Sequence, residues 1–142
     1  MMNTGISKKP STSSPLKTQQ IVNRLRSLPA GWGGTLEYKK PAARAVKKLE
    51  KLLSRLESGF MPWPSIAAIA NGSIIATWLS LNKDITLTID QDGDIQFVTS
   101  LKQLDFQTLE VMDRLDSEGA ITDMAAIDHL MAWYSKDSSS HC

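Results

Sequence analysis

The sequence predicts an α+β domain in which a four-stranded antiparallel β-meander packs against helices, in the order helix, helix, four strands, helix, helix. Apolar residues recur at three- and four-residue spacing near both ends of the chain and at alternate positions in the middle. The dipeptides Asn71-Gly72 and Asp92-Gly93 interrupt the alternating region, as tight hairpin turns do. Because strands and helices occupy separate runs, an α+β layer fold is favoured over a doubly wound parallel sheet.

The length of 142 residues suits one domain, which we expect over residues 16–136. Residues 1–15 are polar and rich in serine and lysine, and residues 137–142 are similar, so both are predicted to be disordered tails. The sequence has neither a long apolar run nor the apolar core of a secretory signal, which predicts a cytoplasmic protein without membrane contact. The single cysteine, Cys142, predicts neither a disulfide nor a metal site.

Two helices are expected before the strands. Residues 16–28 have apolar positions at helical spacing and end at Pro29, and the glycine-rich loop that follows is expected to be anchored by Trp32. A longer helix is expected to begin near Pro41 and to end before Gly59. Its apolar face consists of Ala42, Ala45, Val46, Leu49, Leu52, Leu53 and Leu56.

The four strands are expected at residues 65–70, 73–79, 85–89 and 95–98, with residues 81–84 as the middle connection. Ile85, Leu87 and Ile89 alternate with threonines, which predicts that one face of the sheet is buried under helices. Two more helices are predicted after the strands, separated by a stop at Gly119. Their apolar positions are Leu101, Leu104, Leu109, Met112 and Leu115 in the first and Met124, Ile127, Met131 and Tyr134 in the second.

Charge is divided between the two halves of the chain. Residues 1–57 carry twelve basic and three acidic side chains, whereas residues 58–142 carry four basic and twelve acidic ones. Such asymmetry predicts either a charged partner for one half or two halves that face each other in the fold. Pairing of the basic residues of 41–56 with Asp105, Asp113 or Asp116 would indicate the second arrangement, and unpaired basic residues would favour a nucleic-acid partner.

Residues 28–98 resemble a family of small bacterial proteins. The resemblance rests on the 28–34 segment LPAGWGG, Lys40-Pro41 and the alanine- and leucine-rich helix after it, Pro64-Ser65-Ile66, Trp78 and the 85–93 segment ITLTIDQDG. That family shares an LP-x-x-W-D-G-Y-G-A-x-P opening and a hairpin core ending in L-x-I-x-I-x-x-D-G, and it has Asp where this chain has Gly33. The resemblance implies the α+β fold and a bacterial, phage or mobile-element setting, and it implies no activity.

The sequence offers few groups for catalysis, which predicts that the protein is not an enzyme and binds no cofactor. His129 has no serine or cysteine motif beside it and is interpreted as a surface histidine. Asp90, Asp92 and Asp94 share the D-x-D-x-D start of a calcium loop, but Ile95 and Leu101 stand where an EF-hand has glycine and glutamate. A hairpin turn explains these aspartates with fewer assumptions, so no metal site is predicted.

Two functions remain. The first is protein–protein association, as an inhibitor, an antitoxin-like protein or an accessory protein that could block a defence complex. Candidate contact residues are Met61, Trp63, Trp133 and Tyr134, with core packing as the alternative for each. The second is nucleic-acid binding by the helix at 41–56 and the amino-terminal arm. The basic residues predicted to bind either partner are Arg24, Arg26, Lys39, Lys40, Arg44, Lys47, Lys48, Lys51 and Arg55.

Overall fold

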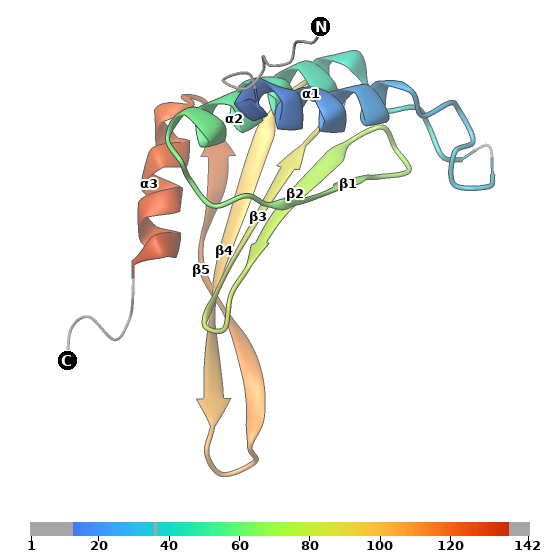
Figure 1. Cartoon of the computed structure of the whole chain (residues 1–142). Helices are drawn as coiled ribbons and strands as arrows, with labels where there is room; N and C mark the ends of the chain where they lie inside the picture. Colours follow the sequence, from blue (N-terminus) through green and yellow to red (C-terminus); the bar gives the residue numbers. More distant parts are fainter. Residues whose placement is uncertain (1–12, 36, 137–142) are drawn as a thin grey trace, which may run out of the picture.

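The structure, a computed structural model, describes residues 13–35 and 37–136 and has three helices and five strands within that part of the chain (Figure 1). The predicted tails lie largely outside these residues, although the first helix begins at Ser13, before the expected Leu16. In chain order the elements are α1 (Ser13–Arg26), α2 (Ala43–Ser58), β1 (Ser65–Ala68), β2 (Ile74–Leu79), β3 (Lys83–Ile89), β4 (Ile95–Asp105), β5 (Glu110–Ile121) and α3 (Ala125–Ser135).

The strands form one antiparallel sheet in the order β1-β2-β3-β4-β5, so each strand pairs with its neighbours in the sequence. The two predicted hairpin turns are confirmed: Gly72 and Gly93 have φ values of 93° and 89°, which favour glycine. In the second turn the backbone also approaches α2, because a Cβ at position 93 would lie 3.3 Å from the carbonyl oxygen of Arg44. The sequence therefore fixes the register of this half of the sheet through its turns.

One face of the sheet is covered by helices, as the alternation in β3 predicts. Ile85, Leu87 and Ile89 are fully buried, and α2 and α3 pack against β3 (Figure 1). The buried residues of α2 are Ala45, Val46, Leu49, Leu52, Leu53 and Leu56, which confirms most of its predicted apolar face. Helix α1 packs on α2, with Thr18 on α1 hydrogen-bonded to Glu57 on α2.

Two side-chain contacts hold the loop before α2 and the end of α3 in place. The indole N–H of Trp32 donates to the Lys39 carbonyl at 2.8 Å, so the glycine-rich loop is closed on itself before α2 begins. The buried Lys83 ammonium donates to the carbonyls of Trp133 and Lys136 at 2.5 and 2.9 Å and so attaches the end of α3 to β3. Within the described residues, no helix has the length and apolar content to cross a membrane.

The prediction of four strands and four helices was wrong in the segment that begins at Leu101. Residues expected to form a helix instead extend β4 to Asp105 and form β5 from Glu110, and Gly119 lies inside β5. Leu101, Leu104, Met112 and Leu115 do have helical spacing, but in a strand a spacing of three places successive side chains on opposite faces. The second expected helix of this region is confirmed as α3.

Candidate functional site

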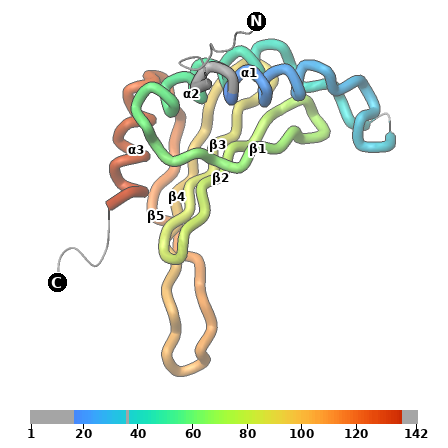
Figure 2. The backbone as a smooth tube through the Cα atoms, viewed as in Figure 1, coloured from blue at the N-terminus to red at the C-terminus, as the bar shows by residue number. Residues whose placement is uncertain are grey.

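The β4–β5 hairpin extends beyond the rest of the sheet as a two-stranded arm (Figures 1 and 2). We define the arm as residues 100–116, which follow a register irregularity between Thr99 and Ser100. This irregularity leaves Asp116 without a partner residue in the register, because Thr99 pairs with Ser117 and Ser100 pairs with Leu115. The arm has no helix across it in Figures 1 and 2, and most of its residues are exposed.

The arm carries six of the ten large apolar side chains that are exposed in the described part of the chain. Phe106 is 82% exposed, Leu109 73% and Val111 66%. The other three are Leu104, Met112 and Leu115. Monomeric proteins rarely leave large contiguous apolar patches in water, so this concentration indicates a surface for contact with another molecule.

Apolar side chains occur on both faces of the arm. Leu104 pairs with Val111 in the antiparallel register, which places these two side chains on one face. Met112 pairs with Gln103 and therefore projects from the other face. A partner can consequently enclose the arm instead of covering a single side of it.

The tip of the arm is a defined turn. The amide of Leu109 donates to the Asp105 carbonyl at 2.6 Å, and the amide of Gln107 donates to Asp105 Oδ1 at 2.8 Å. Leu109 has a φ of 60°, an uncommon value for a leucine. These bonds hold Phe106 and Leu109 at the end of the arm.

The base of the arm is attached to the β2–β3 turn by Lys102. Its ammonium lies 3.3 Å from Asp84 Oδ1 and donates to the Ser80 carbonyl at 3.2 Å, and its backbone amide donates to the Asn82 carbonyl at 2.9 Å. The Asp84 oxygen is buried and has no other hydrogen-bond donor in the described residues, so the ion pair with Lys102 is its compensation. These contacts hold the base of the arm against the β2–β3 turn.

The second feature is a row of cations on α2, which we call the basic stripe: Arg44, Lys47, Lys48 and Lys51. Arg44, Lys47 and Lys51 are exposed and Lys48 is half-buried. None of the four has an ion-pair partner among the described residues, so the pairing with Asp105, Asp113 or Asp116 that would place the two charged halves face to face does not occur. The stripe borders a cavity of about 210 Å³ that Asp92 and Gly93 close on the other side.

Arg55, predicted as part of the same basic face, is engaged elsewhere. Its guanidinium donates to both carboxylate oxygens of Asp128 on α3, from Nε at 2.9 Å and from a terminal nitrogen at 2.7 Å. The hydrogen bond from Arg55 lowers the pKa of Asp128, and the same bond raises the pKa of Arg55.

The other basic residues predicted to bind a partner lie outside α2. Arg26 contacts Glu50 at 3.4 Å, whereas Arg24, Lys39 and Lys40 are exposed without an ion pair in the described part of the chain.

The predicted aromatic contact residues lie half-buried against the core. Trp63, Trp133, Tyr134 and Met61 all pack on the core cluster. The Lys17 ammonium lies 4.5 Å above the Trp63 ring, and Lys83 lies 4.9 Å from the Trp133 ring. Each packs on the core and keeps part of its surface exposed, so contact with a partner stays a prediction for these residues.

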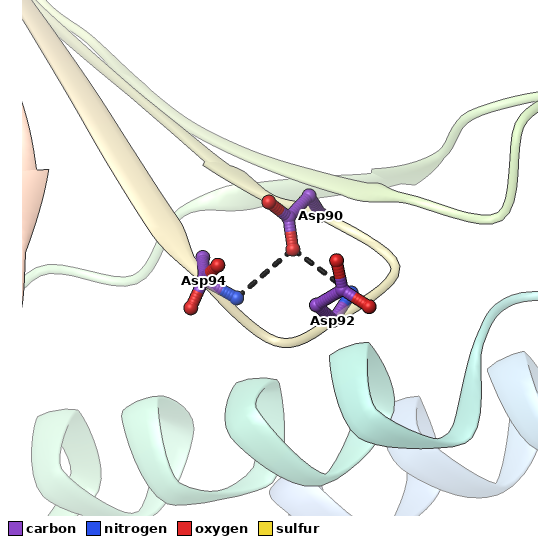
Figure 3. A group of neighbouring side chains, drawn as sticks. All are labelled: Asp90, Asp92 and Asp94. Atoms are coloured by element: carbon purple, nitrogen blue, oxygen red, sulfur yellow. Dashed lines mark hydrogen bonds between the residues drawn. The ribbon is translucent and has the colours of Figure 1, made fainter.

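Asp90, Asp92 and Asp94 converge in the β3–β4 turn, with carboxylate oxygens within 4.8 Å of one another (Figure 3). Asp90 Oδ1 accepts the amides of Asp92 and Asp94 at 2.9 and 3.0 Å. These hydrogen bonds make the first aspartate a turn-forming residue, in agreement with the hairpin interpretation. Carboxylates of this kind can bind a hard cation, but the turn already accounts for their arrangement.

No family model matches the chain, and neither a curated protein nor a solved structure gives a significant match. The arm and the basic stripe are therefore the features from which we infer a function. Sequence reasoning found the basic stripe and missed the arm. The helical spacing of its leucines obscured the arm.

Proposed function

We propose that this chain is a small non-enzymatic binding protein that acts through protein–protein association, with the arm as its contact surface. The observation that carries the proposal is the exposure of Phe106, Leu109 and Val111 on a hairpin that extends from the body. Full burial of a leucine or phenylalanine side chain is worth about 1.5–3 kcal/mol. Contact of a partner with the arm would therefore supply much of the binding energy.

The stability of the arm also favours a partner that covers it. A two-stranded hairpin is marginally stable in water when it lacks a third strand or a packed face. The arm has a rooted base and a bonded tip, but its apolar side chains lie on both faces without a covering element. A partner that packs against it would stabilise the hairpin and remove these side chains from water.

The titratable groups support a binding role. The pKa shifts of the described residues fall on Arg55 and Asp128, which perturb each other through their own ion pair. An ion pair between two surface helices is a structural cause of such shifts, and it does not mark an active site. Within the bacterial, phage or mobile-element setting that the sequence resemblance implies, we propose an inhibitor, antitoxin-like or accessory protein.

The test is capture of interacting proteins with the wild-type chain and with Leu104→Thr/Val111→Thr. These two residues pair across the arm, and threonine keeps the strand propensity while it removes apolar surface. The control is Phe60→Asn, which removes a side chain that is 92% exposed but lies outside the arm. We expect a protein that binds the wild type and the control and not the arm variant. Equal binding by all three chains would contradict the proposal.

Nucleic-acid binding is the second candidate function, favoured by the absence of ion-pair partners for the basic stripe among the described residues. The acidic turn beside the stripe counts against it, because Asp92 would repel a phosphate backbone. A salt titration with labelled DNA and RNA tests it, comparing the wild type with Lys47→Glu/Lys51→Glu. Binding that weakens steeply with salt and is lost in this variant would support this function. Unchanged binding by the variant would show that the basic stripe does not bind nucleic acid.

A further inference from the structure

We infer that the partner of the arm is a second copy of this chain, and that each arm lies across the basic stripe of the other copy. This inference rests on the proposed function and gives its partner an identity. It follows from the charges on the two surfaces, from their positions in the molecule and from the length of the arm.

The two surfaces have opposite charge. The arm carries four carboxylates and two cations, and one of the cations, Lys102, is occupied by Asp84 at its base. The basic stripe carries four cations on one helix, and like charges at a spacing of four residues destabilise a helix when no anion pairs with them. An acidic and apolar arm supplies ion-pair partners, which the stripe lacks among the described residues. Asp92 borders the stripe and would repel the carboxylates of the arm as it would a phosphate, but the arm also brings apolar side chains, which a phosphate backbone does not. The acidic residues of the arm are Asp105, Glu110, Asp113 and Asp116.

The two surfaces cannot meet within one molecule. The tip of the arm lies at the end of the molecule opposite α2 (Figures 1 and 2). Two copies placed side by side in opposite directions bring each tip to the α2 end of the other copy. Such a pair has twofold symmetry and forms the same contact twice.

The arm is long enough for this contact. In Figure 1, α2 lies across the end of the sheet and the arm continues the direction of the strands, so in such a pair each arm crosses the other copy's α2. At roughly 3.3 Å per residue, the part of β4 that belongs to the arm spans about 20 Å. A helix with its side chains is only about 10–12 Å wide. The arm can therefore cross the helix completely, with carboxylates against the cations and apolar side chains against the body beside them.

Arm-to-arm contact between two copies is the arrangement that the charges disfavour. It would bring Asp105 and Glu110 of one copy to the same acidic pair of the other, and these residues already face each other within one arm. Like charges directly opposite one another destabilise strand pairs. The stripe offers a complementary surface, so an arm-to-stripe contact is favoured.

Two charge-reversed chains test the inference. The stripe variant Lys47→Glu/Lys51→Glu replaces exposed cations without an ion pair in the described residues, and the arm variant Glu110→Lys/Asp116→Lys replaces exposed acids. Lysine at position 110 would face Asp105 and form an opposite-charge pair, so the arm should keep its fold. A control with the same charge change as the stripe variant is Arg24→Glu/Lys136→Glu, at exposed positions that belong to neither surface.

Sedimentation velocity at low salt is the measurement. We expect the wild type and the control to be dimers and each reversed variant alone to be a monomer. An equimolar mixture of the two variants should form a dimer again, because the acidic arm of one meets the basic stripe of the other and the reversed arm meets the reversed stripe. Recovery in the mixture also shows that both variants are folded.

Two outcomes would overturn the inference: a wild type that stays monomeric at every concentration, or reversed variants that remain dimeric on their own. A mixture that stays monomeric would overturn it as well. The proposed function survives these outcomes if a different protein still binds the arm and is lost with Leu104→Thr/Val111→Thr. It fails only when no association depends on the arm.

Discussion

Arg55 on α2 donates two hydrogen bonds to the carboxylate of Asp128 on α3, at 2.9 and 2.7 Å. The division of charge along the sequence left open whether the basic amino-terminal half contacts the acidic carboxy-terminal half. This ion pair joins the two halves. It is the one ion pair between the two halves among the described residues, and the basic stripe has no ion-pair partner there. The two halves therefore touch without neutralising each other.

The Arg55–Asp128 pair predicts how stability depends on pH. The pKa of Asp128 is lowered from its ordinary value of 3.8, so the unfolded chain takes up a proton at a higher pH than the folded chain. The pair therefore stabilises the fold fully above that ordinary value and loses its effect as the pH falls through the lowered one. In thermal melts between neutral and strongly acidic pH, Asp128→Asn should melt slightly lower than the wild type at neutral pH, and the difference should vanish in acid. A difference independent of pH would contradict this.

The buried face of α2 predicts a large loss of stability for Leu53→Ala. Leu53 is fully buried in the core cluster, and removal of a buried leucine side chain costs about 2–5 kcal/mol. Chemical denaturation should show a lower midpoint with this loss. Lys51→Ala, on the exposed side of the same helix, is the control and should leave the midpoint nearly unchanged. Equal midpoints for Leu53→Ala and the wild type would mean that the helix faces are reversed.

Gly93 should tolerate alanine worse than Gly34 does. Both have positive φ, 89° and 101°, a backbone region that costs other residues roughly 1–2 kcal/mol. A Cβ at position 93 also lies 3.3 Å from the Arg44 carbonyl, whereas nothing lies within 4 Å of one at position 34. Thermal melting of Gly93→Ala and Gly34→Ala should show the larger decrease for Gly93→Ala. Equal decreases would show that the β3–β4 turn does not press against α2.

Lys83→Met should loosen α3. The methionine would fit the buried site but could not donate to the carbonyls of Trp133 and Lys136, and an unpaired buried polar group costs about 1–3 kcal/mol. Amide hydrogen exchange should become faster in the last turn of α3 and remain unchanged in α2. Unchanged exchange in α3 would show that the ammonium does not hold this helix.

Sequence reasoning worked where local chemistry determined the structure. The glycines of two tight turns specify the β1–β2 and β3–β4 hairpins, and the alternation of Ile85, Leu87 and Ile89 specifies the buried face of β3. The spacing of leucines in α2 specifies both a helix and its inward side. These signals come from residues close together in the sequence, so they can be read without knowledge of tertiary contacts.

The arm could not be predicted in the same way. Leu101 and Leu104 lie three residues apart, a spacing that gives one apolar face in a helix and two in a strand. A solvent-exposed hairpin with apolar residues on both faces is the less stable arrangement for an isolated chain, so the pattern favoured a buried helix. Pairing with the end of β4 decides between them, and within the arm it joins residues 5 to 15 positions apart, beyond the three- to four-residue spacing in which helical periodicity is read.

The measurement that tests the central claim most directly is site-specific photocrosslinking in cells that express the protein. A photoreactive phenylalanine analogue placed at Phe106, at the tip of the arm, is compared with the same analogue at Phe60, which is also exposed. We predict a defined protein adduct from position 106, either to a second copy or to another protein, that Leu104→Thr/Val111→Thr removes and that position 60 does not give. No adduct from position 106, or the same adducts from both positions, would contradict the claim that the arm is the interaction surface.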